Sequence, residues 1–98
     1  MLFRSGTAFD NRGLAYLKGG QLEQAIADFD SALKLNPKNP GSLFGRGMAK
    51  LARNDTTGSA DIEAAKAIKP NIAEIFAKSG VPEILAKERM DAPVRKAE

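Results

Sequence analysis

The sequence predicts an all-α fold of the helical-repeat solenoid type, and three observations support this. Two similar segments, GLAYLKGG from Gly13 and GMAKLARN from Gly47, begin 34 residues apart. Two more, ADFDSALKLNP ending at Pro37 and ADIEAAKAIKP ending at Pro70, end 33 residues apart, so the second copy has lost one residue in its turn. Each copy also carries two stretches with helical spacing of apolar residues. A period near 34 with two helices per copy is typical of helix–turn–helix solenoids.

The first copy predicts two helices. Apolar residues recur at three- and four-residue steps over 9–17, and Gly19-Gly20 ends this helix because glycine adopts the left-handed cap conformation without penalty. A second stripe covers 22–33 and ends before Asn36-Pro37, since proline disfavours helical geometry in the residue before it. The first copy is therefore predicted to be a helical hairpin.

The second copy predicts a second hairpin. Asn39 is a good N-cap and Pro40 suits the first helical position, so a helix is expected over 40–51. Residues 54–57 form the turn, and a fourth helix carries the apolar residues of 62–68 and ends before Pro70.

A fifth helix is predicted over 71–79. Ile72, Ile75 and Phe76 form its apolar stripe, Lys78 favours its C-terminal end, and Gly80 ends it. Beyond it, residues 81–98 predict a short helical turn and a disordered tail.

The composition excludes several kinds of chemistry. The chain has 98 residues, enough for one small domain, and contains no Cys, no His and no Trp. Disulfides, Cys/His zinc sites, a thiol nucleophile and a histidine general base are therefore excluded. The carboxylate pairs Asp28/Asp30 and Asp61/Glu63 are interpreted as solvated helix surface, because residues two apart on a helix point to different faces. We expect no enzyme, no cofactor and no metal.

The charge pattern also limits the classes of partner that the chain can bind. The net charge is +3, the longest run of basic residues is the pair Arg95-Lys96, and the chain has six aromatic residues. This disfavours nucleic acid, which needs a clustered basic face and stacking side chains. No apolar stretch approaches the length of a membrane span, and the N-terminus lacks the apolar core of a signal peptide. A chain that is complete would then be cytoplasmic.

The first copy resembles a tetratricopeptide repeat. The matching residues at the family spacing are Phe9, Gly13, Tyr16, Ala25, Phe29, Ala32 and Pro37. The second copy matches at Leu43, Gly47, Ile62, Ala65 and Pro70. Arg12 and Arg46 stand where the family has Leu, Lys50 replaces an aromatic residue, and Gly58 replaces an Ala. The stretch from Ala60 to Val81 also looks like the C-terminal repeats of tetratricopeptide proteins common in alphaproteobacteria.

The resemblance implies a right-handed solenoid of two hairpins with a solvating C-terminal cap. It implies one domain over residues 1–80, with the repeats at about 6–39 and 40–70 and the capping helix at about 71–80.

The resemblance also implies a concave groove lined by the first helix of each repeat. The predicted partner-binding residues are Asp10, Asn11, Leu14, Leu17, Lys18, Phe44, Met48 and Leu51. Asp10, Leu14 and Gly45 stand where relatives that hold a peptide carboxylate have polar clamps, so that mode is disfavoured. What remains is an apolar strip, formed by Leu14, Leu17, Phe44, Met48 and Leu51. An exposed strip of this kind usually marks an interaction site, and the alternative is that the chain's own packing or a second copy covers Leu14, Leu17 and Leu51.

Two functions are therefore expected from the sequence. The first is a protein-interaction module that binds a partner peptide or segment in the groove, through the apolar strip. The alternative is a self-associating module, a homodimer that uses the same strip or the uncapped N-terminal edge and has no foreign ligand.

Overall fold

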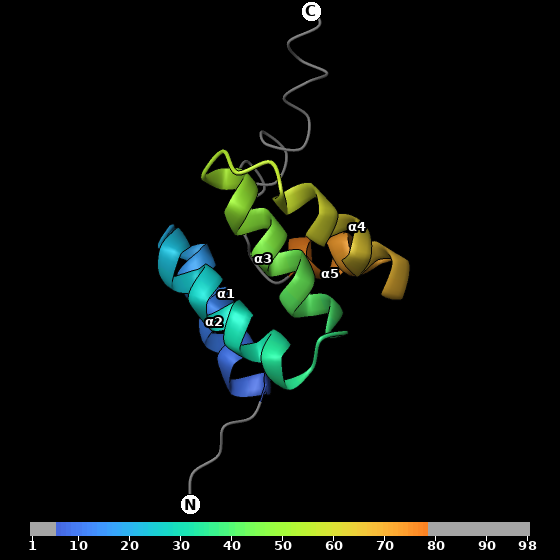
Figure 1. The fold of residues 1–98 in the computed structure, drawn as a ribbon, viewed down its shortest axis with the longest axis horizontal. Coiled ribbons are helices and arrows are strands. Elements are labelled where there is room, and N and C mark those ends of the chain that lie inside the picture. Colours follow the sequence, from blue (N-terminus) through green and yellow to red (C-terminus); the bar gives the residue numbers. More distant parts are fainter. Residues whose placement is uncertain (1–5, 79–98) are drawn as a thin grey trace, which may run out of the picture.

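The computed structural model describes residues 6–78. The described residues form five helices and no strand (Figure 1). The helices are α1 (Gly6–Lys18), α2 (Leu22–Leu35), α3 (Pro40–Ala52), α4 (Gly58–Ile68) and α5 (Ile72–Lys78). The predicted all-α fold is confirmed. The turn and tail predicted for 81–98 lie outside the described residues, and the predicted domain boundaries stay a prediction.

Two of the predicted helix boundaries, the end of α1 and the start of α3, are fixed by local hydrogen bonds and backbone conformation. Gly20 has a φ of +80°, which glycine adopts without strain, and the amide of Gln21 donates to the carbonyl of Tyr16 at 2.9 Å. The Asn39 side chain accepts hydrogen bonds from the amides of Gly41 at 2.9 Å and Ser42 at 3.3 Å, which satisfies two amides at the start of α3. The predicted end of α1 and the predicted N-cap of α3 are confirmed.

The turn between α3 and α4 is held by Asp55. Its Oδ1 accepts hydrogen bonds from the Thr57 hydroxyl at 2.6 Å and the Thr57 amide at 3.0 Å. These two bonds, the hydroxyl first, hold the pKa of Asp55 below its ordinary value. Asn54, with a φ of 67°, turns the chain just before it. This compact turn lets α4 begin at Gly58, earlier than the apolar stripe alone indicated.

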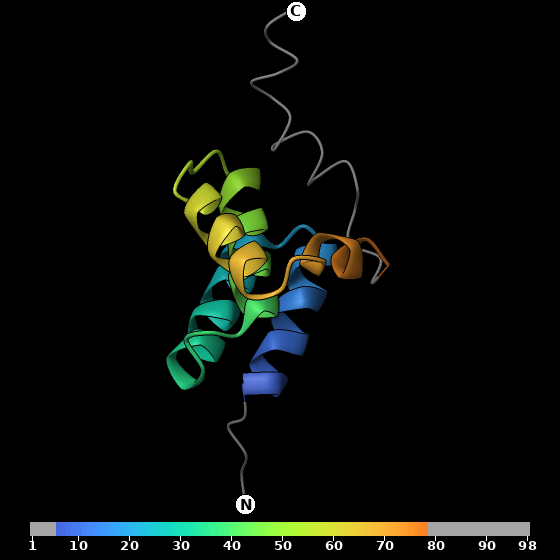
Figure 2. The same cartoon turned by 90° about the vertical axis from the view of Figure 1, so that its right-hand side faces the viewer.

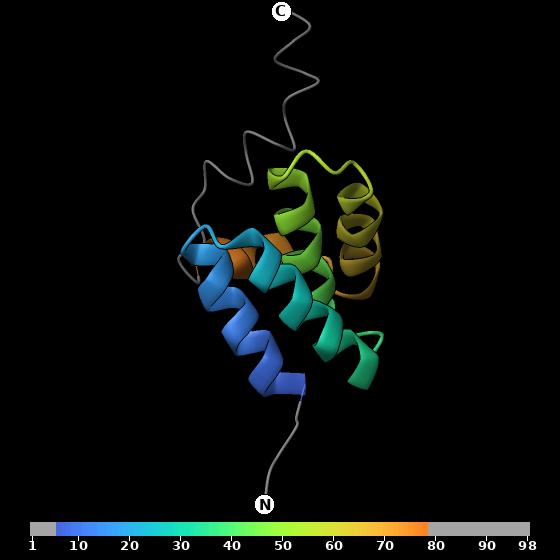
Figure 3. The ribbon, with the colours of Figure 1, turned by 60° about the vertical axis from the view of Figure 1, so that its left-hand side comes forward.

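The two hairpins stack side by side. Helix α3 packs on α4 within its own hairpin and on α2 of the first hairpin, and it also touches α1. Figure 2 shows α2 and α4 on one side of α3 and α1 and α5 on the other. Figure 3 shows α1 and α2 side by side, with α4 at the far end of the stack. The N-terminal face of the stack is therefore made by α1 and α2.

Phe29 is the centre of the contact between the hairpins. Its ring has no exposed surface, and it lies between Gly13 of α1 and Gly45 of α3. A Cβ at position 45 would overlap the ring, so only glycine allows α3 to approach α2 this closely.

A second close approach joins α3 to α4. The backbones of Gly47 and Gly58 come so near each other that a Cβ on either would overlap the carbonyl oxygen of the other. Gly58 therefore has a packing role at the position where the family has Ala.

Helix α5 turns back after Pro70 and packs on α3 and α4. Its buried residues, Ile72 and Phe76, belong to one apolar cluster that runs through both hairpins. Helix α5 thus covers the last hairpin.

Candidate interaction site

The predicted apolar strip is not exposed. Leu17 is 0% exposed, Phe44 2% and Met48 3%, while Leu14 and Leu51 are half-buried against the same apolar cluster. The expectation that the strip is exposed is therefore wrong, and the alternative that the chain's own packing covers Leu17 is confirmed. The role of these residues in partner binding stays a prediction.

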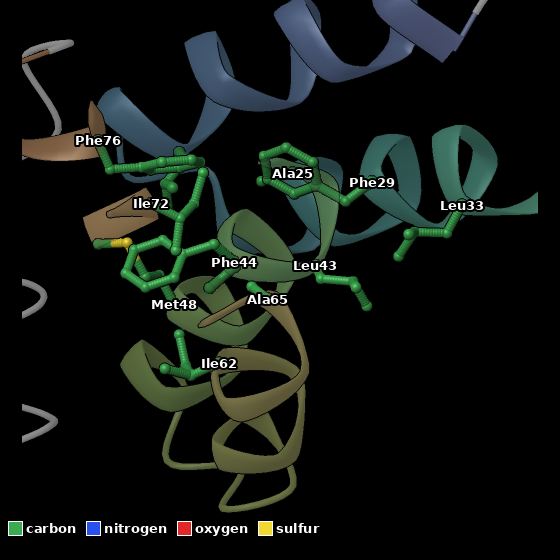
Figure 4. Close-up of a cluster of buried hydrophobic side chains, with 12 residues drawn as sticks. Ala25, Phe29, Leu33, Leu43, Phe44, Met48, Ile62, Ala65, Ile72 and Phe76 are labelled. Atoms are coloured by element: carbon green, nitrogen blue, oxygen red, sulfur yellow. The ribbon is translucent and has the colours of Figure 1, made fainter. Parts of the chain in front are cut away.

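Helix α5 accounts for the burial of the part of the strip that α3 contributes. The rings of Phe76 and Phe44 lie 4.8 Å apart between centroids, tilted by 58°. Figure 4 shows Ile72 and Phe76 of α5 gathered with Phe44 and Met48 of α3. The chain therefore places one of its own helices on the face of α3 that was predicted to hold a partner.

The predicted polar residues of the groove are spread over α1. Asn11 and Lys18 are exposed, and Asp10 is half-buried. The Ser42 hydroxyl donates to Oδ1 of Asp10 at 3.0 Å, so this carboxylate joins α1 to the start of α3. Burial raises the pKa of Asp10, and the bond from Ser42 offsets part of that rise.

Asp28 and Asp61 are buried, which corrects their interpretation as solvated surface. Nε and Nη2 of Arg12 donate to the two carboxylate oxygens of Asp28 at 2.7 and 2.9 Å. Nε and Nη2 of Arg46 bind Asp61 in the same way, at 2.8 and 2.9 Å. Each two-bond ion pair joins the two helices of one hairpin.

Arg46 also joins the two hairpins. Its Nη1 donates to Oδ1 of Asp30 at 2.7 Å, and Nζ of Lys50 lies 3.8 Å from Asp61. The hydrogen bonds to Asp61 raise the pKa of Arg46 above its ordinary value, and those to Asp28 do the same for Arg12, so both side chains stay charged. One guanidinium thus binds two carboxylates from different repeats.

The sequence held a signal for these pairs. Arg12 and Arg46 depart from the family's Leu at the same repeat position, and Asp28 and Asp61 also match each other in the repeat. Both repeats thus carry an arginine at a position that is otherwise apolar, and a carboxylate follows it at a similar distance along the chain. This pattern predicts an ion pair between the two helices of each hairpin.

The part of the chain that the structure describes contains no cluster of three acidic residues suited to a metal ion. None of the helices within residues 6–78 has the length and apolarity needed to cross a bilayer.

Comparison with known proteins agrees with the repeat geometry. The model of the tetratricopeptide (TPR) repeat family matches residues 13–52, which run from the middle of α1 to the end of α3. No solved structure matches the chain significantly.

Two curated relatives share the repeat pattern. The chain is 37% identical over 82 residues to superkiller complex protein 3 of Homo sapiens and 33% identical over 82 residues to that of Mus musculus. In both cases the match covers 82% of this chain and 5% of the relative. The chain therefore spans about one-twentieth of the length of these relatives. TPR repeats generally mediate protein–protein interactions and act as non-catalytic scaffolds. With two stacked helical hairpins at the family's period and a matching family model, the chain belongs to the tetratricopeptide repeat family.

Proposed function

We propose that the chain is a non-enzymatic interaction module that binds an amphipathic helix of a partner protein on the face of α3 that α5 covers, beside α1. In this proposal the partner helix takes the place that α5 occupies in the free chain. Phe44 and Met48 are the anchoring residues of the module, and Leu14, Leu17 and Leu51 border them.

The packing of α5 supports this proposal most directly. Helix α5 has only seven residues and buries just two of them, Ile72 and Phe76, which are four positions apart. Anchors at i and i+4 are the pattern by which an amphipathic helix binds an apolar groove. Two apolar side chains of a helix, four positions apart, are therefore enough to pack on this face of α3.

The polar residues around this face fit a role in orientation. Lys18 is exposed at the end of α1, and the carboxylate of Asp10 lies beside the start of α3. A partner helix with an acidic residue near Lys18 is favoured by charge. Asn11 occupies the same repeat position as Gly45, which faces the first hairpin, so Asn11 contributes less to this face.

The proposal agrees with the curated relatives, whose name describes a subunit of a complex. Self-association through the apolar strip has less support, because helix α5 of the same chain already covers Phe44 and Met48.

The test measures binding of a labelled, side-chain-stapled peptide with the sequence of residues 70–80 by fluorescence anisotropy. The receptor is the full chain carrying Ile72→Ala and Phe76→Ala, which weakens the chain's own α5. We expect this receptor to bind the peptide at least about tenfold more tightly than the wild-type chain, since each lost anchor removes a few kcal/mol from the competing contact.

The matched control receptor carries Ile75→Ala, because Ile75 lies on the same helix but is exposed. It should bind the peptide as the wild-type chain does. A peptide with Phe76→Ala should not bind. Equal affinity of all receptors, with circular dichroism showing each folded, would disprove a helix site on α3.

A further inference from the structure

The contact between the hairpins shows what packs on the first helix of a repeat. On α3, Arg46 binds Asp30 of α2 through Nη1, Gly45 lies against the Phe29 ring, and Ala49 is fully buried. Helix α2 therefore contacts α3 through two neighbouring residues, the large apolar Phe29 and the acidic Asp30 that follows it.

The same repeat positions on α1 are open. Asn11, Arg12 and Ala15 stand 34 residues before Gly45, Arg46 and Ala49, and all three are exposed. We call these three residues the outer face of α1. The Arg12 side chain is 62% exposed, against 23% for Arg46.

Arg12 is held in the geometry that Arg46 uses. Both arginines donate hydrogen bonds from Nε and Nη2 to the Asp of their own repeat, at nearly equal distances. The guanidinium carbon of Arg12 lies 5.9 Å from the centroid of the Tyr16 ring, which supports this side chain. Nη1 of Arg12 has no hydrogen-bond partner within residues 6–78, whereas Nη1 of Arg46 binds Asp30.

We propose that the outer face of α1 is a second interaction surface, which binds an acidic amphipathic α-helix of another protein. The helix places a carboxylate on Nη1 of Arg12 and packs the large apolar residue that precedes this carboxylate beside Asn11 and Ala15. It takes the place on α1 that α2 takes on α3 through Phe29 and Asp30. This surface is distinct from the face covered by α5, and it does not depend on the function proposed above.

The residues of this chain argue against a second copy as the occupant. Asp30 is already bound to Arg46. Glu63 has the equivalent place on α4 and is exposed, but Ile62 before it is only 4% exposed and cannot enter another molecule as Phe29 enters the contact with α3. At this repeat position, neither α2 nor α4 therefore offers both a free acid and an accessible apolar residue.

One difference between the repeats sets the strength of the site. In the second repeat Lys50 adds a positive charge 3.8 Å from Asp61, so two cations face two carboxylates. Tyr16 holds that position in the first repeat, so Arg12 alone faces Asp28 and the incoming carboxylate.

The experiment uses a stapled peptide with the sequence of residues 22–35 and the change Asp28→Ala. The staple is needed because a free helix of this length is marginal in water. The change at Asp28 prevents the peptide from replacing α2 in its own hairpin. Titrated into the isotope-labelled full chain, the peptide should shift the amide resonances of Asn11, Arg12 and Ala15. A second peptide that also carries Asp30→Asn should bind about fivefold more weakly, as expected for loss of one charge-assisted hydrogen bond.

A pair of chain variants provides the control. Ala15→Glu adds bulk and negative charge to the outer face of α1 without touching a buried group, so binding should fall at least about tenfold. Ala27→Glu changes another exposed alanine, on α2, and should leave binding unchanged. The proposal is overturned if both peptides bind equally, if the shifts fall on α3 and α5, or if neither peptide binds. It is also overturned if the chain alone forms dimers that Ala15→Glu abolishes, since a second copy would then occupy this face.

Discussion

At the scale of single residues, ion pairs replace part of the apolar contact between helices. Arg12 and Arg46 stand where the family has Leu, and each binds a buried carboxylate, Asp28 or Asp61. Removing the partner of a buried carboxylate costs far more than removing an exposed ion pair. The stability of this chain is therefore sensitive to a few charged residues that look like ordinary surface in the sequence.

Asp10 provides a prediction about pH. Because burial raises its pKa, the folded state binds a proton more readily than the unfolded state, and stability falls as the pH rises from the ordinary carboxylate value through the raised one. Asp10→Asn keeps an oxygen that accepts the Ser42 hydrogen bond and removes the buried charge. Thermal unfolding should show this variant to be more stable than the wild-type chain at pH 7.

The comparison at low pH is the control for Asp10. Below the ordinary value of 3.8, Asp10 is protonated in both states, so the advantage of the variant should disappear. A gain in unfolding temperature that is the same at pH 3 and pH 7 would mean that the amide, and not the lost charge, is responsible.

At the scale of elements, close helix approach depends on glycine at defined positions. In a Gly45→Ala variant, the new Cβ would overlap the buried Phe29 ring. Replacing a helical glycine with alanine also raises the intrinsic stability of the helix, by about 1 kcal/mol. Overpacking of this kind costs about 1–3 kcal/mol. We expect a net loss of up to about 2 kcal/mol in the free energy of unfolding, measured with urea.

Gly6→Ala is the matched control. Position 6 is also helical, but a Cβ there meets its nearest neighbours at 3.7 and 3.9 Å, which is ordinary contact. This variant should be neutral or slightly more stable. Similar losses in both variants would show that glycine at 45 is not required by the Phe29 ring.

The helices themselves were predictable from the sequence because their signals are local. Apolar spacing, Gly19-Gly20, Asn39-Pro40 and Pro70 act within one turn of the residues they affect. The burial of Phe44 and Met48 was not predictable in this way, since it depends on where the chain goes after Pro70. Ile72 and Phe76 partly indicated this burial. Two apolar residues four positions apart lie on one face of a helix, and that face must pack against another part of the protein.

At the scale of the whole molecule, Arg46 connects both hairpins through Asp61 and Asp30. Arg46→Leu restores the residue typical of the family but leaves Asp61 buried, with only Lys50 3.8 Å away. We expect a loss of about 3 kcal/mol in the free energy of unfolding. Combined with Asp61→Ala, the loss should be smaller than the sum of the two single changes.

Arg53→Leu is the control for this prediction. Arg53 also reaches the first hairpin, through Glu23 at 3.0 Å, but both side chains are exposed. Its loss should cost less than about 1 kcal/mol. Additive effects of Arg46→Leu and Asp61→Ala, or an equal loss on changing Arg53, would contradict a special role for the buried bridge.

The stacking of neighbours has a consequence for the folding kinetics. Helix α1 packs mainly on α2, α2 on α3 and α3 on α4, so most partners are close in the sequence. Chains dominated by such short-range contacts fold on microsecond-to-millisecond timescales. The return of Phe76 to Phe44 joins residues more distant in sequence than the two helices of a hairpin, and α5 is held by only two buried side chains, so we expect this contact to open first. The amides of α5 should therefore exchange with solvent before those of the four helices it rests on.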